Sequence, residues 1–155
     1  MRTGIGVRIV VVGMLLGGLV GGTEAPAMAR GRRCTQQGTS STDVLTGTAN
    51  ADRVCGKSGN DDIESLGGND SIWAGKGDDT VEGDSGNDRL FGGAGNDNLE
   101  GNRGADVVRG GAGDDVVHVT DRDSRDRVIG GKGSDTCFVD QGDVVRGCEQ
   151  VHVVP

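Results

Sequence analysis

Aspartate recurs at every ninth residue along most of this chain. From residue 43 to residue 115 the interval holds without a miss, at Asp43, Asp52, Asp61, Asp70, Asp79, Asp88, Asp97, Asp106 and Asp115. An aliphatic residue stands two places after each aspartate, and from the third copy on a glycine stands two places before it. A fixed short period of this kind predicts a coil of stacked repeats rather than a globular domain.

Composition supports the same conclusion, because the chain has few residues from which to build a thick apolar core. Only 33% of the 155 residues are hydrophobic, and Trp73, Phe91 and Phe138 are the only aromatic residues. The 31 glycines are typical either of a disordered polar chain or of tight turns, and the strict period favours the turns.

Segments such as GGAGNDNLE (92–100) and GGAGDDVVH (110–118) complete the pattern G-G-x-G-x-D-x-U-x, where U is aliphatic. This pattern resembles the haemolysin-type calcium-binding nonapeptide (RTX) repeat, over roughly residues 38–151. The resemblance implies an all-β, right-handed parallel β-roll, a β-solenoid with two repeats per turn. It also implies calcium ions in the turns, each between two loops eighteen residues apart.

The residue after each aliphatic position supports an eighteen-residue turn independently of the resemblance. Alternate repeats place Thr46, Glu64, Glu82, Glu100 and His118 there, whereas the intervening repeats place Cys55, Trp73, Phe91 and Arg109. Two repeats per turn would separate these residues onto two different faces, and one repeat per turn would mix them.

Calcium prefers hard oxygen ligands, which aspartate and the carbonyl groups of glycine turns provide. The expected carboxylate ligands are Asp61, Asp70, Asp79, Asp88, Asp97, Asp106 and Asp115, with Asp52, Asp126 and Asp135 as further candidates. Backbone ligands are expected near Gly59, Gly68, Gly77, Gly86, Gly92, Gly93, Gly95, Gly104, Gly110, Gly111 and Gly113. Five pairs of loops keep their turn glycine, which predicts about five well-formed sites. Residues 56–118 form the core of this array.

Departures from the pattern predict the ends of the array. The copies GTSSTDVLT (38–46) and GTANADRVC (47–55) lack the fourth-position glycine, so residues 30–55 are expected to form an N-terminal cap. Two residues are inserted in 119–126, which predicts a bulged loop before the repeat resumes at 130–138. An EF-hand loop is the alternative there, but its central glycine and closing glutamate are missing. Residues 139–155 are expected to form a C-terminal cap.

The first 29 residues have the pattern of a secretory signal peptide. Two arginines precede an apolar run from Ile9 to Gly22, and the segment ends in Ala27-Met28-Ala29. A membrane anchor is the alternative, although the run is interrupted by glycines and is short for a spanning helix. Cleavage after Ala29 would leave 126 residues with 14 basic and 23 acidic side chains, a net charge near −9. Nucleic acid and anionic membranes are therefore not expected partners.

Four cysteines lie after the predicted cleavage site, as is typical of exported disulfide proteins. Of the three pairings we favour Cys34 with Cys55 and Cys137 with Cys148, because these would clamp the two ends of the array. Zinc binding is the alternative, but the chain has no C-x-x-C pair and its two histidines are not spaced with the cysteines.

Catalytic motifs are missing from the sequence, which contains neither H-E-x-x-H nor G-x-S-x-G. We therefore expect a secreted, non-enzymatic calcium-binding protein. Alternative roles are an adhesion or envelope-binding module that uses the face of Trp73 and Phe91, or an accessory to a toxin or secreted hydrolase. Partners of that face could be an envelope polysaccharide or a second copy of the chain.

Overall fold

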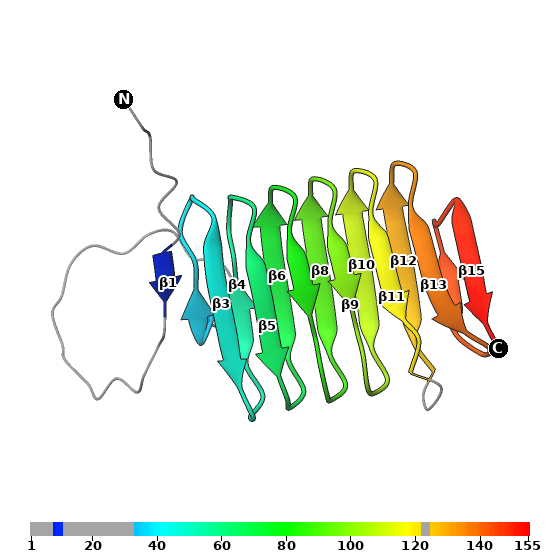
Figure 1. Ribbon diagram of the computed structural model, residues 1–155, viewed down its shortest axis with the longest axis horizontal. Coiled ribbons are helices and arrows are strands. Elements are labelled where there is room, and N and C mark those ends of the chain that lie inside the picture. Colours follow the sequence, from blue (N-terminus) through cyan, green and yellow to red (C-terminus); the bar gives the residue numbers. More distant parts are fainter. Residues whose placement is uncertain (1–7, 11–32, 122–124) are drawn as a thin grey trace, which may run out of the picture.

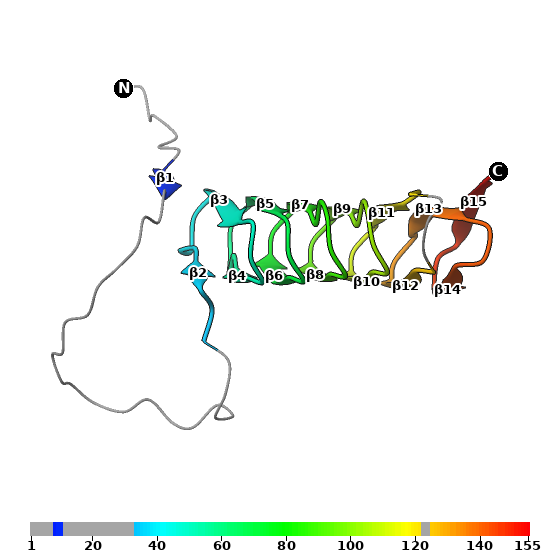
Figure 2. The ribbon, with the colours of Figure 1, turned by 90° about the horizontal axis from the view of Figure 1, so that it is seen from below.

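The chain winds into a flat coil of short parallel strands, seen face-on in Figure 1 and edge-on in Figure 2. The computed structural model describes residues 8–10, 33–121 and 125–155. Its two sheets form two layers, and the chain passes from one layer to the other at each turn of the coil. No helix occurs in the described residues, so none of them forms a helix that could cross a membrane.

The first sheet contains the odd-numbered strands in their order along the chain. They are β1 (Arg8–Val10), β3 (Asp43–Thr48), β5 (Asp62–Leu66), β7 (Thr80–Glu82), β9 (Asn98–Glu100), β11 (Val116–Val119), β13 (Thr136–Asp140) and β15 (Gln150–Val154). Strand β1 lies within the predicted signal peptide, whose other residues are outside the part that the structure describes.

The second sheet contains the even-numbered strands, again in chain order. They are β2 (Gln36–Gln37), β4 (Arg53–Cys55), β6 (Ser71–Lys76), β8 (Arg89–Ala94), β10 (Val107–Ala112), β12 (Arg127–Lys132) and β14 (Val144–Arg146). Every pair of neighbouring strands is parallel. The all-β parallel β-roll predicted from the sequence is therefore confirmed.

The register of the strands gives the length of one turn. Ile63 pairs with Val81 in the first sheet, and Ile72 pairs with Leu90 in the second, so each partner lies eighteen residues further on. After the insertion the separation becomes twenty, as in the pairing of Val108 with Val128. Two repeats therefore make one turn, and the inserted residues lengthen one loop without disturbing the register.

The core is a thin layer between the two sheets, built from the aliphatic position of each repeat. Leu45, Val54, Ile63, Ile72, Val81, Leu90, Leu99, Val108, Val117 and Val128 are all fully buried, and Cys137 takes the same place in the resumed repeat. The first position of the repeat also points inward, with Ala74, Val119 and Val139 buried. Such a layer buries little apolar area per residue, so it stabilises the coil less than a globular core would.

Both predicted disulfides are present and lie at the two ends of the array. Cys34 bonds to Cys55 beside β4, and Cys137 bonds to Cys148 beside β13. No free cysteine occurs among the described residues. Each bond ties a segment at one end of the coil to the neighbouring turn. The last turn at each end has a neighbouring turn on one side only.

Candidate metal centre

The repeated aspartates form two ladders along the two edges of the coil. The first ladder contains Asp43, Asp61, Asp79, Asp97, Asp115 and Asp135, and the second contains Asp52, Asp70, Asp88, Asp106 and Asp126. All of these side chains are buried, with at most 8% of their surface exposed. The regular register of the strands stacks them turn upon turn, as the sequence predicts.

From Asp61 and Asp70 onward, one carboxylate oxygen of each rung accepts a hydrogen bond from the backbone of the preceding turn. The amide of Asp79 donates to Oδ1 of Asp97 at 3.0 Å, and the amide of Asp88 donates to Oδ1 of Asp106 at 2.8 Å. The bond recurs up each ladder as far as Asp115 to Asp135 and Asp106 to Asp126, which lie twenty residues apart. The inserted loop therefore leaves Asp126 in the ligand register.

The second carboxylate oxygen, Oδ2, has no hydrogen-bond donor along the core of the array. It is buried and unpartnered in nine aspartates: Asp61, Asp70, Asp79, Asp88, Asp97, Asp106, Asp115, Asp126 and Asp135. A buried carboxylate oxygen without a donor or cation costs several kcal/mol, so nine of them cannot be part of a stable bare coil at neutral pH. The geometry therefore requires a proton or a cation beside these oxygens along each edge.

Glycine provides the space beside these oxygens. A Cβ added to the first glycine of a repeat would collide with Oδ2 of the aspartate five residues on, as with Gly92 and Asp97 or Gly110 and Asp115. The same Cβ on Gly92 would lie 2.9 Å from the carbonyl oxygen of Gly110, in the next turn. A carboxylate oxygen and a carbonyl oxygen of the next turn thus both lie close to the first glycine of these repeats.

Burial raises the pKa of the eight carboxyl groups from Asp61 to Asp126 in these ladders, and neighbouring acidic groups raise it further. Asp106 has the highest value, about 8, because burial and the charges of Asp88, Asp126 and Asp121 outweigh its hydrogen bond from the Asp88 amide. For the same kinds of reason the pKa is about 7 for Asp97 and Asp126. A bound proton or a cation is therefore needed to neutralise these groups near pH 7.

Comparison with known protein families identifies the repeat. The model of the RTX calcium-binding nonapeptide repeat matches in four copies, over residues 37–63, 56–90, 91–121 and 118–145. The chain belongs to this family. Comparison with curated proteins gave no match. RTX repeats bind calcium, and calcium ions are accordingly the cofactor of this protein.

The oxygen sets of both ladders fit calcium, which takes six to eight oxygen ligands from carboxylates and carbonyls. In this RTX coil the unpartnered Oδ2 atoms and the carbonyls of the glycine turns would hold the ions. Bound calcium supplies positive charge that offsets the repulsion between stacked carboxylates.

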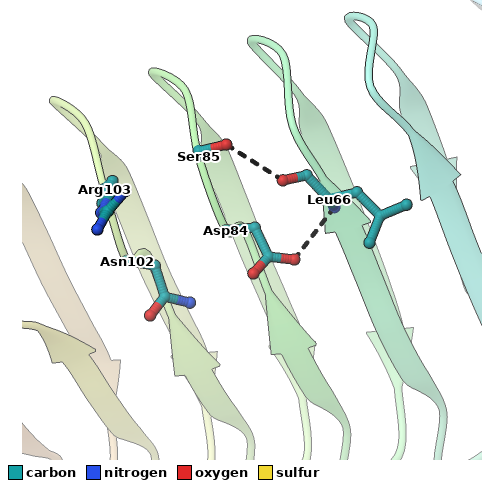
Figure 3. Close-up of a pocket in the computed structure, with 5 residues that line it drawn as sticks. All are labelled: Leu66, Asp84, Ser85, Asn102 and Arg103. Atoms are coloured by element: carbon teal, nitrogen blue, oxygen red, sulfur yellow. Dashed lines mark hydrogen bonds between the residues drawn. The ribbon is translucent and has the colours of Figure 1, made fainter.

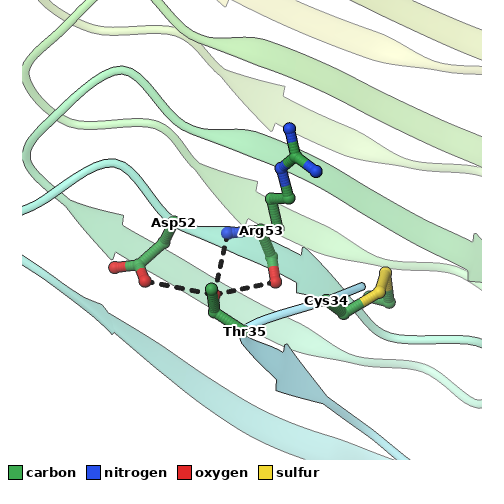
Figure 4. Close-up of a disulfide and its surroundings, with 5 residues drawn as sticks. Cys34, Thr35, Asp52 and Arg53 are labelled. Carbon is green, nitrogen blue, oxygen red and sulfur yellow. Dashed lines mark hydrogen bonds between the residues drawn. A yellow bond between two sulfur atoms is a disulfide. The ribbon is translucent and has the colours of Figure 1, made fainter. Parts of the chain in front are cut away.

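Asp52 differs from the other nine candidate ligands. Its Oδ2 accepts hydrogen bonds from the amide and the hydroxyl of Thr48, both at 2.7 Å. Its Oδ1 lies 3.1 Å from the hydroxyl of Thr35, which follows Cys34 of the N-terminal disulfide (Figure 4). The protein itself therefore satisfies both oxygens of Asp52.

No sequence motif marks the last rung of either ladder. The amide of Asp126 donates to Oδ1 of Asp143 at 2.9 Å, and the amide of Asp135 donates to Oε2 of Glu149 at 2.8 Å. Neither acid lies in a complete repeat, although Gly142 before Asp143 is a remnant of the turn. Only the register of β14 and β15 shows that these two residues continue the ladders.

The residue before each aspartate forms a second, outer ladder, in which the hydrogen bonds run in the opposite direction along the coil. Its side-chain oxygen accepts from the amide of the following turn, as when Asn87 donates to Asn69 at 2.8 Å and Asn96 donates to Asp78 at 2.8 Å. These side chains are exposed and bonded to backbone. These bonds join successive turns and do not use the buried Oδ2 atoms of the next residue.

The second edge also has a shallow pocket of about 310 Å³, lined by Leu66, Asp84, Ser85, Asn102 and Arg103. Leu66, Asp84 and Asn102 have positive φ angles of 62° to 72°, in the repeat position where the first edge has mostly glycine. The amide of Leu66 donates to Oδ2 of Asp84 at 3.2 Å (Figure 3). None of the predicted calcium ligands lines this pocket.

Proposed function

We propose that this protein is a secreted structural module whose coil folds when calcium fills the two ladders. The nine buried Oδ2 atoms without a donor are the observation that carries the proposal. The thin core and the disulfides at the ends add too little stability to offset that many buried carboxylates. Because calcium binds only the folded coil, the free energy of calcium binding contributes to the free energy of folding.

The proposed ligands are the nine aspartates with an unpartnered oxygen, together with the carbonyls of their glycine turns. Consecutive members of this set make four pairs in the first ladder and three in the second, so we propose seven ions. Asp52 is not among the ligands, because Thr48 and Thr35 satisfy it. Each inner loop borders two ions, which makes binding cooperative.

The proposed affinity is modest, on the order of 10⁻⁴ to 10⁻³ M, as in other extracellular calcium modules. Magnesium should replace calcium poorly, because it retains its waters and demands a tighter octahedral shell. At such an affinity the coil would fold in the calcium-rich medium outside the cell and remain unfolded inside it.

Export is supported by the pattern of residues 1–29 and by the two disulfides, which form and persist in oxidising compartments. We propose cleavage after Ala29. N-terminal sequencing of the protein recovered from the medium should begin at Arg30, and retention of the segment in the cell envelope would support an anchor instead.

No catalytic role is part of the proposal. The RTX β-roll is a structural calcium-binding fold, and its buried polar groups are the ladders themselves.

Circular dichroism with and without a chelator tests the proposal. The protein should lose most of its β-sheet signal when calcium is removed and regain it when calcium is restored, with magnesium at the same concentration ineffective. A β-sheet spectrum that survives chelation, with no metal detected by atomic emission, would contradict it. An Asp97→Asn/Asp88→Asn variant should need more calcium to fold than the wild-type protein.

A further inference from the structure

The two outer faces of the coil carry opposite charge. On the first sheet the outward residues include Asp62, Glu64, Glu82 and Glu100, and none of the described strands β3 to β15 has a lysine or arginine there. On the second sheet the outward residues include Arg53, Arg89, Arg109, Arg127 and Arg146, with no acid among them. The coil is thus acidic on one side and basic on the other.

The acidic side is not compensated within the molecule. Glu64, Glu82 and Glu100 stand directly opposite one another on adjacent strands, an arrangement that is destabilising for like charges. In the described part of the chain none of them forms an ion pair with a basic side chain. The acids surrounding Glu82 also help to raise its pKa, after burial as the main cause.

Each face has one column of side chains from the last repeat position, running along the coil axis. The acidic column on the first sheet reads Glu64, Glu82, Glu100, His118, Phe138 and His152 from the N-terminal end. The arginine column on the second sheet reads Cys55, Trp73, Phe91, Arg109, Ile129 and Arg146. Both columns have one residue per turn, so their spacing is the same, about 4.8 Å.

The aromatic residues of the two columns lie at opposite ends of the coil. Trp73 stacks on Phe91 near the N-terminal end, with ring centroids 5.7 Å apart. Phe138 stacks between His118 and His152 near the C-terminal end, at 4.4 Å and 4.8 Å. Trp73 is 39% exposed, which is high for so large an apolar side chain.

We propose that the acidic column of one molecule packs on the arginine column of a second copy, with the two coil axes antiparallel. Reversing one column places Glu100 opposite Arg109 and Glu64 opposite Arg146. It also places His118 opposite Phe91 and Phe138 opposite Trp73. Glu82 then faces the strand of Arg127 and Ile129. Charges therefore meet opposite charges at two positions of the columns, and rings meet rings at two others.

Strand direction favours the same orientation. Strands of the two sheets run in opposite directions around the coil (Figure 1). When the second copy is turned end for end, its second-sheet strands run the same way as the first-sheet strands they contact. The last repeat positions of the two molecules then face each other. A parallel arrangement would instead make the contacting strands run in opposite directions, so the last repeat positions of one molecule would face the seventh positions of the other and Glu100 would not face Arg109.

The contact uses different faces on the two molecules, so it does not close on itself. Each added copy leaves one acidic and one basic face free, and repetition gives an open lateral ribbon. Each contact is only about 24 Å long, five inter-strand spacings, so it is weak and needs a high local protein concentration. The proposal needs only a folded coil, and its failure would leave the proposed calcium dependence untouched.

Sedimentation velocity of the calcium-loaded protein, as recovered from cells, tests association between about 10 μM and about 1 mM. The wild type should sediment faster as its concentration rises. The charge-reversed variants Glu82→Arg/Glu100→Arg and Arg109→Glu/Arg127→Glu should each stay monomeric, whereas their equimolar mixture should associate again. A Lys76→Glu/Lys132→Glu control changes equal charge on exposed residues outside both columns and should behave as the wild type.

Circular dichroism in calcium should show that every variant keeps its β-sheet signal. A wild type that remains monomeric over the whole range overturns the proposal, as does a mixture that fails to associate.

The antiparallel orientation of the two molecules is tested by mild oxidation of mixed cysteine variants. Glu64→Cys should cross-link with Arg146→Cys and not with Arg53→Cys, which lies at the other end of the arginine face; the reverse result would overturn the antiparallel arrangement.

Discussion

Thr48 donates two hydrogen bonds to Oδ2 of Asp52, one from its amide and one from its hydroxyl, both at 2.7 Å. Thr39 contacts Asp43 in the same way, at 2.6 Å and 2.9 Å. In the repeats that follow, the equivalent oxygen has no donor. In the first two copies of the repeat, threonine therefore provides donors for Oδ2, the oxygen that lacks a donor in the later copies.

This difference predicts unequal effects of two matched substitutions on calcium stoichiometry. Asp97→Asn should remove a ligand shared by two loop pairs, with the loss of one to two bound ions and a higher calcium concentration for folding. Asp52→Asn should leave the number of ions unchanged, because that carboxylate already has protein donors. Equilibrium dialysis followed by atomic emission measures the stoichiometry of each variant.

The two variants control for each other, since each replaces one buried carboxylate with an amide in the same repeat position. Equal loss of calcium from both would show that Asp52 is also a ligand and that the threonine bonds are broken in the loaded protein. A small loss of stability in Asp52→Asn is expected, about 1–3 kcal/mol, because hydrogen bonds to a charged group are lost.

Much of this architecture could be predicted from the sequence because one physical constraint repeats nine residues apart. Each copy needs a turn glycine, a buried carboxylate and an inward aliphatic residue, so even Cys137 could be placed in the core from its register alone. The spacing of unlike residues such as Glu82 and Phe91 was enough to predict the length of a turn. The two disulfides followed from their position at the ends of the array.

Other features could not be predicted because they depend on contacts between turns rather than on the repeat itself. Asp143 and Glu149 continue the ladders from incomplete copies, where no motif marks them. Thr48 donates two hydrogen bonds to Asp52 where a cation would otherwise be needed. The aspartate itself keeps its place in the nine-residue period, so the period does not reveal the difference. Leu66 has a positive φ of 72°, in a position that the pattern reserves for glycine.

Two glycines with similar backbone angles should tolerate alanine very differently. Gly95 has a φ of +131°, and a Cβ there would overlap the carbonyl oxygen of Gly77 in the preceding turn. Gly142 has a φ of +119°, but a Cβ there would meet nothing within 4 Å. Gly142→Ala should therefore lower the free energy of unfolding by about 1–2 kcal/mol through backbone strain alone.

Gly95→Ala adds a steric clash to the same strain, so its cost should be about 3 kcal/mol or more. Urea denaturation of both variants in saturating calcium compares the two costs. Equal destabilisation would contradict this prediction. It would mean that neighbouring turns separate locally to admit a methyl group, although a continuous ladder of hydrogen bonds joins them.

The C-terminal disulfide should contribute measurably to stability. The bond joins Cys137 to Cys148 across 11 residues, and closing a loop of this length stabilises a protein by about 3 kcal/mol in the chain-entropy model. A Cys137→Val/Cys148→Ser variant keeps an aliphatic side chain in the core column and removes only the bond. Its free energy of unfolding in calcium should fall by that amount, and an unchanged value would show that β15 docks without the covalent link.

Acid should stabilise the calcium-free coil, since the pKa of eight buried aspartates is higher in the folded state than the ordinary value of 3.8. The folded chain binds protons more tightly than the unfolded chain, so this stabilisation is complete below about pH 4 and is lost as the pH rises through the folded pKa values. Those values are about 7 for Asp97 and Asp126 and about 8 for Asp106. In chelator, β-sheet circular dichroism should therefore increase as the pH falls from about 8 to about 5.

Protons and calcium neutralise the same carboxylates of the folded coil, so less calcium is needed to fold the protein at low pH, and the calcium concentration at the folding midpoint should increase as the pH rises over the same interval. Asp106→Asn provides the matched test, because it removes the group with the highest pKa. In that variant the acid-induced gain of structure should begin near pH 7 rather than near pH 8. A calcium-free protein whose β-sheet content increases with pH would show that repulsion in the ladders does not oppose folding.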